Sequence, residues 1–213
     1  GGEEFPSAYE ATDRIQLISS FIPAVLCGDA DTPWDYGNSC GTSLMDYRKR
    51  EFTDQLIEAV GGDLVGGAAA LREKLPALVA PDSRVGRIAA YFVEKYGFDP
   101  SCAVMAGSGD NPQTKVLVSG SLLSLGSSFV FMVDTDGRTL DREGYANGMY
   151  DGLGRPFLFG CRTNGAMVWD RVRTAAGSAK SDYAAAERAL ATTPPGSVLF
   201  LWQPFAESFP VSP

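Results

Sequence analysis

Apolar residues recur every three or four positions in several stretches of the chain, which is the pattern of amphipathic helices. The first such stretch runs from about 8 to 27, where Pro23 is expected to kink the second half. The same pattern predicts further helices at 52–60, 68–75, 85–96, 164–173 and 181–191. The first hundred residues are therefore expected to be mostly helical.

Short apolar runs with β-branched residues begin near residue 101 and predict strands. The first run, 102–107, is expected to be a buried strand that ends at Gly107. Runs at 122–125 and 128–133, with a turn at 134–137 after them, predict a β-hairpin, and further strands are expected at 156–160 and 198–202. The chain is thus predicted to be α/β, with a domain boundary near 118–122.

The charge and composition exclude several classes of function. The 213 residues carry 18 Lys and Arg against 26 Asp and Glu, a formal charge of −8, so nucleic acid is not an expected partner. There is no histidine, which excludes Ser-His-Asp and Cys-His catalysis and leaves carboxylates as the candidate general bases. The four cysteines lack CxxC spacing and are expected to be reduced.

The longest apolar stretch, 15–26, is interrupted by polar residues and is shorter than the roughly 20 residues that cross a bilayer. No cleavable signal is recognised at the start of the chain. The expectation is a soluble, cytoplasmic protein without a membrane partner.

Two glycine-flanked polar loops follow predicted strands and are the candidate sites of chemistry. In the first loop, 107–111, glycines let a ligand approach the backbone, and Asp110 is a candidate general base. In the second, 124–128, backbone N–H groups and two hydroxyls form a candidate anion cradle. From spacing alone, an ordinary turn and an ordinary hairpin bend remain open alternatives for the two loops.

Taken in order, these loops resemble a known enzyme family. GDN at 109–111 followed by LGSS at 125–128 is similar to paired turns of the FGGY carbohydrate kinases and, within them, the xylulose kinases. The block DYGNSCGTSLMDYRKREF at 35–52 and the segment RPFLFGCRTNGAMVWDRVR at 155–173 resemble further blocks of that family. The likeness extends over residues 5–175.

The resemblance implies an actin-like ATPase fold of two ribonuclease-H-like domains, here incomplete. Residues 1–119 would be the C-terminal part of the sugar-binding domain, and residues 120–213 the first part of the ATP-binding domain. The implied reaction transfers the γ-phosphate of ATP, with Mg²⁺, to the terminal hydroxyl of a ketopentose, D-xylulose first. Sugar and ATP are the implied partners, and a homodimer is among the expected assemblies.

The resemblance also assigns roles to individual residues. Asp110 would be the catalytic base that accepts the sugar hydroxyl proton, and Asp110 and Asn111 would bind the sugar. Gly126 and Ser127 would approach the ATP phosphates, with Ser127 in place of the family's usual threonine. Ser128 is assigned no role.

The chain departs from the family pattern in length and in two motifs. The family's first phosphate loop and its C-terminal Gly-Gly adenosine segment are not found. The chain is therefore expected to be a central fragment of such a kinase. On its own it is expected to be inactive and to expose apolar faces. The stretch 113–122, which contains Lys115, is shorter than in many xylulose kinases, so the identity of the sugar substrate is left open. A non-catalytic binding or interaction module derived from such a kinase, and a kinase for another sugar or polyol, remain alternatives; Asn111, where glycerol kinases have glutamine, argues against glycerol.

Three other groups of residues are expected to be structural. The segment 34–36 has the composition of a carbohydrate-stacking platform, but a loop with a capping Asp35 is favoured. The acidic residues of 134–141 lack the spacing of a calcium loop and are expected to form a solvated turn. Thr163 or Asn164 is expected to cap the helix that follows.

Overall fold

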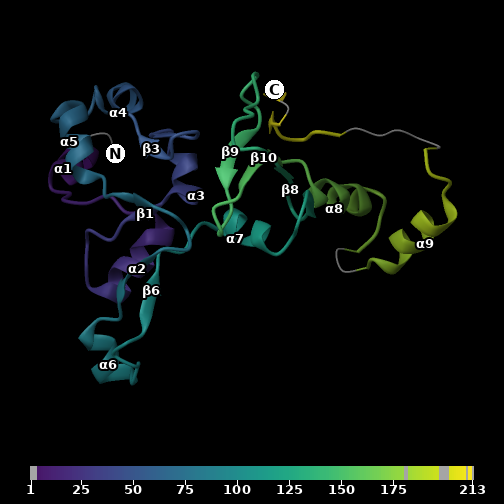
Figure 1. Ribbon diagram of the computed structural model, residues 1–213. Helices are drawn as coiled ribbons and strands as arrows, with labels where there is room; N and C mark the ends of the chain where they lie inside the picture. The colour runs from purple at the N-terminus through teal and green to yellow at the C-terminus, as the bar shows by residue number, and fades with distance from the viewer. Residues whose placement is uncertain (1–3, 180–181, 197–201, 210, 213) are drawn as a thin grey trace.

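The computed structural model describes residues 4–179, 182–196, 202–209 and 211–212. The chain forms two halves that lie side by side (Figure 1). Helices and short strands make up the first half, and an antiparallel sheet with two following helices makes up most of the second. The predicted mixture of helix and strand is confirmed. The strand expected at 198–202 falls almost wholly outside the described residues.

The helices are α1 (Glu4–Glu10), α2 (Ile18–Cys27), α3 (Tyr36–Ser39), the 3-10 helix η1 (Cys40–Thr42), α4 (Asp54–Gly61), α5 (Gly67–Lys74), α6 (Ala90–Tyr96), α7 (Asp110–Val116), α8 (Ala166–Ala175) and α9 (Ala184–Thr192). The strands are β1 (Trp34–Asp35), β2 (Met45–Asp46), β3 (Glu51–Phe52), β4 (Leu78–Val79), β5 (Arg84–Arg87), β6 (Ala103–Met105), β7 (Leu122–Leu125), β8 (Phe129–Asp134), β9 (Asn147–Tyr150), β10 (Pro156–Arg162), β11 (Glu207–Ser208) and β12 (Val211–Ser212). The helices predicted at 52–60, 68–75, 164–173 and 181–191 correspond to α4, α5, α8 and α9.

The core of the first half is built around Trp34, which is 1% exposed. Its indole packs edge to face on Phe52, with ring centroids 5.8 Å apart. Four further buried side chains complete the cluster. They come from the segment after η1, from α4, and from α5 and its C-terminal end: Leu44, Ile57, Leu71 and Leu75. Burying each of these large side chains contributes about 1.5–3 kcal/mol. The amphipathic pattern of α4 and α5 is thus explained by a shared apolar contact.

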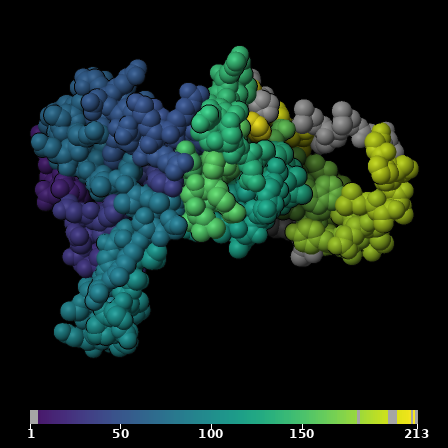
Figure 2. Space-filling view, in the orientation of Figure 1, coloured from purple at the N-terminus to yellow at the C-terminus, as the bar shows by residue number. Residues whose placement is uncertain are grey.

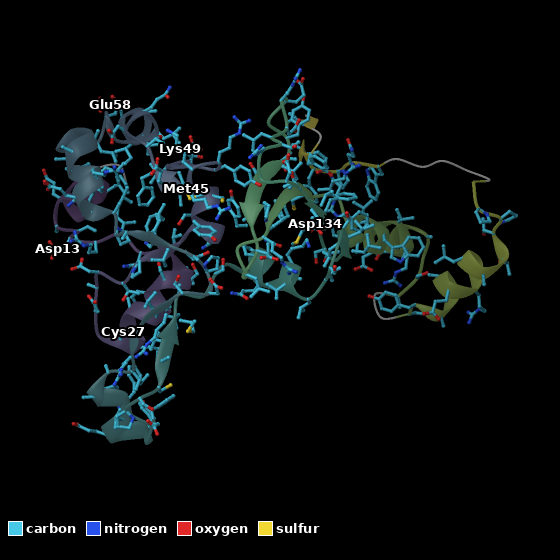
Figure 3. The ribbon with its side chains drawn as sticks, in the orientation of Figure 1. Asp13, Cys27, Met45, Lys49, Glu58 and Asp134 are labelled. Atoms are coloured by element: carbon cyan, nitrogen blue, oxygen red, sulfur yellow. The ribbon has the colours of Figure 1, made fainter. Side chains whose placement is uncertain are left out.

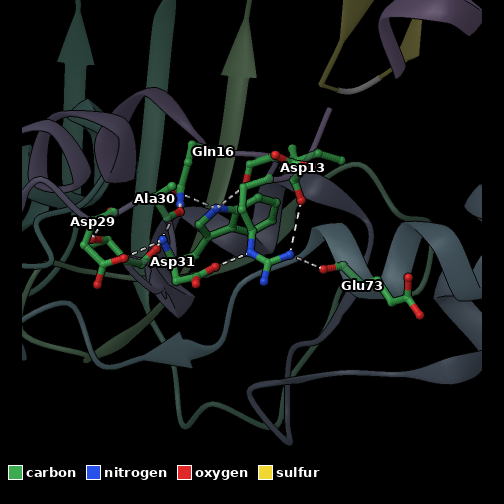
Figure 4. Close-up of polar contacts among 10 residues, drawn as sticks. Asp13, Gln16, Asp29, Ala30, Asp31 and Glu73 are labelled. Atoms are coloured by element: carbon green, nitrogen blue, oxygen red, sulfur yellow. Dashed lines mark hydrogen bonds and ion pairs between the residues drawn. The ribbon is translucent and has the colours of Figure 1, made fainter. Parts of the chain in front are cut away.

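Residues 11–17 form an irregular segment between α1 and α2. Figure 4 shows Asp13 and Gln16 of this segment among their polar contacts. The Trp34 indole N–H donates to the Ile15 carbonyl oxygen at 3.1 Å. The Gln16 amide donates to the carbonyl oxygens of Ala30 and Thr32 at 2.8 and 3.0 Å. A helix would direct the Ile15 carbonyl to the N–H four residues on, so the single helix expected over 8–27 is wrong. Pro23 does lie inside α2.

The helix expected at 85–96 is also wrong in its first half. Residues 84–87 form β5, which pairs antiparallel with β6, and only α6 is helical. The Ile88 N–H continues the pairing by donating to the Cys102 carbonyl oxygen at 3.0 Å. Pairing with a strand distant in sequence outweighs the local helical pattern here, as is common for short strands.

The strand predicted at 102–107 is confirmed as β6, although only part of it is buried. Val104 is 5% exposed, whereas Met105 is 47% exposed. With β5 and α6, this strand forms an arm that projects from the body of the molecule (Figure 2). The expected burial is therefore limited to one side chain of the strand and Ala106 after it.

The second half is organised by a four-stranded antiparallel sheet in the order β7-β8-β10-β9. The predicted hairpin of 122–125 with 128–133 is confirmed as β7 and β8, with Leu125 opposite Phe129. The strand predicted at 156–160 is β10, which pairs with β8 along its length. Strand β9 was not expected from the sequence. It lies at the edge of the sheet that faces the first half (Figure 1).

Tyr150, the last residue of β9, joins the two halves. Its side chain is 1% exposed, and its hydroxyl donates to the Tyr47 carbonyl oxygen at 2.7 Å. Its ring centroid lies 4.9 Å from that of Tyr47 and 5.1 Å from that of Tyr36. The Arg50 guanidinium lies over the same ring at 4.7 Å. Aromatic and cation–π contacts of this kind each contribute about 0.5–1.5 kcal/mol beyond burial.

Helix α7 is held to the second half by polar contacts. The Gly152 N–H donates to the Pro112 carbonyl oxygen at 3.1 Å. The Lys115 Nζ lies 2.7 Å from an Asp134 carboxylate oxygen, and it also donates to the Val118 carbonyl oxygen at 3.1 Å. Figure 3 labels the Asp134 side chain. The Lys115 side chain is 2% exposed and that of Asp134 is 54% exposed. The pair therefore has a buried cation and an anion that reaches solvent.

Apolar side chains lie on the surface of α2, namely Ile18, Phe21, Ile22 and Val25. The expectation of exposed apolar faces is thus confirmed. The four cysteines are free. Among the described residues, every helix is too short or too polar to cross a bilayer.

The uneven burial of Lys115 and Asp134 predicts unequal effects of removing each charge. Asp134→Asn leaves the buried ammonium without its counter-ion and is expected to lower the free energy of unfolding by about 1–3 kcal/mol. Lys115→Met keeps a similar volume and leaves a carboxylate that water can solvate, so a loss below about 1 kcal/mol is expected. Urea unfolding of each variant beside the original chain measures the two losses.

Asp63→Asn is the matched control, because Asp63 is exposed and no ion pair among the described residues involves it. This variant is expected to leave stability unchanged. The hydrogen bond from Lys115 lowers the pKa of Asp134. The stabilisation should therefore be present above the ordinary aspartate pKa and be lost as the pH falls through the lowered value. A larger loss in Lys115→Met than in Asp134→Asn would contradict this account of the pair.

Candidate functional site

The first candidate loop leads directly into a helix. The chain leaves β6, passes through Gly107 in a left-handed conformation (φ 69°) and starts α7 at Asp110. Asp110 is exposed, and one of its carboxylate oxygens accepts the Asn111 N–H at 2.8 Å. A carboxylate in the first turn of a helix interacts favourably with the helix dipole. Asp110 is thus fixed near the start of α7 while its side chain remains open to a ligand.

Asn111 lies beside Asp110 on the same turn. Its side-chain amide lies 3.4 Å from the Asp110 oxygen that accepts the backbone bond, and the residue is half-buried. The structure therefore brings together the two residues predicted to bind a sugar. A carboxylate next to an amide can accept one hydroxyl proton and donate to or accept from another hydroxyl.

Asp35, which was expected only to cap a helix, also contacts this loop. One of its carboxylate oxygens accepts the Asn38 N–H at 2.8 Å and the Ser108 hydroxyl at 2.6 Å. The capping role is confirmed, and the side chain is 1% exposed. Burial raises the pKa of Asp35, although the hydrogen bonds from Ser108 and Asn38 act in the opposite direction. No local signal in the sequence indicates the bond to Ser108, which spans 73 residues.

Trp34, beside it, does not form a stacking platform. The ring is 1% exposed and packs in the core, so no ligand can reach its face. The structural role and the capping Asp35 are confirmed, but the expected loop is wrong, because Trp34 and Asp35 form β1 and Tyr36 starts α3.

The second candidate loop, 126–128, is the turn between β7 and β8. Gly126 and Ser127 are exposed. The turn is pressed against the start of α8, since the Ala166 N–H donates to the Gly126 carbonyl oxygen at 2.9 Å. A side chain at Gly165 would bring its Cβ to 2.6 Å from the Ser127 carbonyl oxygen. The exposed Ser127 hydroxyl beside the positive end of a ten-residue helix suits an anion.

The expected cap of this helix is wrong, because the position before α8 is Gly165. Thr163 and Asn164 instead donate their backbone N–H groups to the Glu207 carboxylate at 2.8 and 2.9 Å. The Asn164 side chain donates to Glu207 as well, at 2.7 Å. Burial acts to raise the pKa of Glu207, but these bonds and the Arg162 charge outweigh it and lower the pKa. Glu207 thus fixes the chain just ahead of α8.

The two candidate loops are linked through their elements and not by direct contact. In the part of the chain that the structure describes, no hydrogen bond or ion pair joins Asp110 to the turn 126–128. The Lys115–Asp134 pair connects the helix that starts at Asp110 to the strand that follows the turn.

Asp136 and Asp141 accept backbone N–H groups of the turns that follow β8, as expected, whereas the turn expected to include Asp134 is wrong there because Asp134 is the last residue of β8. An Asp136 oxygen accepts the N–H groups of Arg138 and Thr139 at 2.8 and 2.9 Å, and these bonds lower the pKa of Asp136 to about 2. Within the described residues, no group of three or more Cys, Asp or Glu is arranged to hold a metal ion.

Comparison with known proteins gives matches in both sequence and structure. The chain is 32% identical over 177 residues to a probable D-xylulose kinase A of Aspergillus fumigatus, a match over 81% of this chain and 30% of that protein. A crystal structure of xylulose kinase from Bifidobacterium adolescentis matches 89% of this chain and 41% of that one, with 24% identity and a TM-score of 0.72. A gluconate kinase structure from Lactobacillus acidophilus matches 87% and 37%, with 19% identity and a TM-score of 0.73.

The chain spans about a third of the length of the curated relatives it matches. It matches no model of a known protein family. The structural matches, at below 25% identity, show a shared fold.

Gly165→Ala is expected to displace the turn 126–128 from the start of α8, because the added Cβ would collide with backbone atoms of Ser127 and Ser128. Overpacking of this kind costs about 1–3 kcal/mol. Urea unfolding measures the loss, and fluorescence of Trp169 on α8 reports local change. Gly41→Ala is the matched control, because a Cβ there meets nothing within 4 Å. Equal stability of the two variants would contradict this packing.

Proposed function

Since the chain is related to the FGGY carbohydrate kinases and has part of their actin-like ATPase fold, we propose that the protein transfers the γ-phosphate of ATP to a hydroxyl of a small sugar. D-xylulose is the proposed substrate, because the relatives matched in sequence bear the name D-xylulose kinase. Residues 1–119 would contribute to the sugar side and residues 120–213 to the ATP side.

The proposal is carried by the exposed Asp110 at the first position of α7. A sugar hydroxyl attacks phosphorus as its proton passes to the Asp110 carboxylate, and the bond between the γ-phosphorus and the ADP oxygen breaks. Phosphoryl transfer depends mainly on positioning and charge stabilisation, so one carboxylate base suffices and no histidine is needed. Asn111 would hold a neighbouring sugar hydroxyl.

On the ATP side, the turn 126–128 would contact phosphate oxygens. Its support is the exposure of Gly126 and Ser127 and their place beside the start of α8. Mg²⁺ is generally held by one or two carboxylates together with substrate phosphates, so it would arrive with ATP and neutralise developing charge. Asp110 serves as the base in this proposal, so the ATP phosphates would be the main ligands of the ion.

Gluconate is a second candidate substrate, favoured by the structural match to a gluconate kinase. A coupled ADP-release assay with D-xylulose, gluconate and glycerol discriminates between the candidates. Sugar-independent binding of ATP without turnover would instead favour a non-catalytic binding module.

In the full-length gene product, Asp110→Asn is expected to lower kcat by about 10²–10⁴-fold, because asparagine keeps the size but cannot accept the proton. The KM for the sugar should change much less. Steady-state kinetics with the best sugar of the panel measure both values. Asp63→Asn serves as the control for a surface aspartate of the same chain. Turnover of Asp110→Asn within tenfold of the original would refute the base assignment.

Gly126→Ala is expected to raise the KM for ATP by about tenfold while the fold is retained. The added Cβ meets its nearest atom at 3.6 Å, an ordinary contact, so stability should hold. It would stand where phosphate must approach the backbone. Gly41→Ala is the control, and an unchanged KM for ATP in Gly126→Ala would remove this turn from the ATP site.

A further inference from the structure

The position of Asp110 depends on the loop before it, because residues 106–109 connect β6 to α7. The backbone on one side is left-handed at Gly107, and Gly109 has no side chain. The Ala106 N–H donates to the Ser83 carbonyl oxygen at 2.9 Å at the start of the loop. The Ser108 side chain supplies the side-chain anchor nearer to Asp110. Its hydroxyl donates to the Asp35 carboxylate at 2.6 Å.

Asp35 is itself rigidly held. It pairs with Val79 in the parallel strands β1 and β4, and its carboxylate accepts the Asn38 N–H at 2.8 Å. The Ser39 hydroxyl donates to the Asp35 carbonyl oxygen at 2.6 Å. Asp35 is 1% exposed, and both its backbone and its carboxylate are hydrogen-bonded. It therefore gives the loop a fixed point of attachment.

A second contact holds the loop from the Asn38 side. A Cβ at Gly109 would lie 2.5 Å from the Asn38 side-chain oxygen, so the loop backbone packs directly on that amide. The Asn38 amide nitrogen donates to the Ser19 hydroxyl on α2 at 2.8 Å. The residue before Asp110 is thus in contact with a side chain that is fixed at its other end.

The Asp35–Ser108 bond also lies where the second half meets the first. A Cβ at Gly37 would lie 2.7 Å from the Tyr150 carbonyl oxygen, 2.8 Å from the Asp35 carboxylate and 3.0 Å from the Ser108 hydroxyl. There is no room for a side chain over this bond. The other carboxylate oxygen of Asp35 is buried and has no hydrogen-bond partner among the residues that the structure describes. Ser108 and Asn38 therefore carry the side-chain hydrogen bonds of the group.

We propose that Asp35 is a positioning residue for Asp110, acting through the hydroxyl of Ser108. The inference rests on the proposed function, in which Asp110 is the base. It extends that function by naming the group that orients the Asp110 carboxylate. A displacement of about 1 Å at a reacting group can lower a rate by about 10²-fold, so loss of the Ser108 anchor should act on turnover.

The test separates this role from the capping of α3. Ser108→Ala removes the anchor and leaves the Asp35 bond to the Asn38 N–H in place. Ser108→Thr keeps a hydroxyl and should restore activity. Ser101→Ala is the matched control, because the Ser101 hydroxyl makes an equally short 2.6 Å bond to Asp99 on the exposed surface.

In the full-length gene product, Ser108→Ala is expected to lower kcat at least tenfold with less than threefold change in the KM for sugar. Ser108→Thr should recover most of the loss, and Ser101→Ala should match the original protein. A merely structural bond would lower the melting temperature without this split between kcat and KM. Unchanged kcat in Ser108→Ala, or an effect of Ser108→Ala without any effect of Asp110→Asn, would overturn the proposal.

Amide hydrogen exchange across residues 107–116 gives a readout that does not depend on kinase activity. Faster exchange in Ser108→Ala, reversed in Ser108→Thr, is expected. If the original protein shows no sugar-dependent turnover, the proposed function fails, and unchanged exchange would then overturn the anchoring contact as well. Faster exchange in that case would support the anchoring contact alone.

Discussion

The burial of Tyr150 between the two halves is the contact on which the rest of the arrangement depends. Its ring packs against tyrosines of the first half, and its carbonyl oxygen lies against Gly37. The residue ends β9, whose register with β10 is set by Tyr150 opposite Pro156. Because β10 pairs with β8, the same contact fixes the sheet that carries the turn 126–128 relative to the loop before Asp110.

Those parts of the fold that depend on local pattern could be predicted from the sequence. Helices α4 and α5 have amphipathic spacing and glycines near their ends, and the hairpin of β7 and β8 has two apolar runs around a glycine turn. Residues 11–17 and 84–87 could not be predicted in the same way. Their conformations are set by Trp34 and by β6, and a local helical pattern carries no information about either contact.

The residues of the candidate site can likewise be separated into those that local sequence predicts and those that it does not. Asp110 and Gly126 are found from glycine-flanked turns and from the family resemblance. Asp35 and Glu207 contribute through hydrogen bonds that span 73 and up to 44 residues, so sequence spacing does not reveal their partners. The absence of a capping side chain at Gly165 has a similar cause, since the packed turn leaves no space for one. Side chains that support a site are thus harder to find than those exposed in it.

The bond network at Glu207 has a consequence for the order in which the molecule is made. The N–H groups of Thr163 and Asn164 have their carboxylate partner 44 and 43 residues later in the chain, respectively. During translation, α8 and the turn against it leave the ribosome before Glu207 does. Until Glu207 has been synthesised, the backbone N–H groups of Thr163 and Asn164 can be hydrogen-bonded only to water or to other groups. The native hydrogen bonds ahead of α8 therefore form only after the chain has been extended to Glu207.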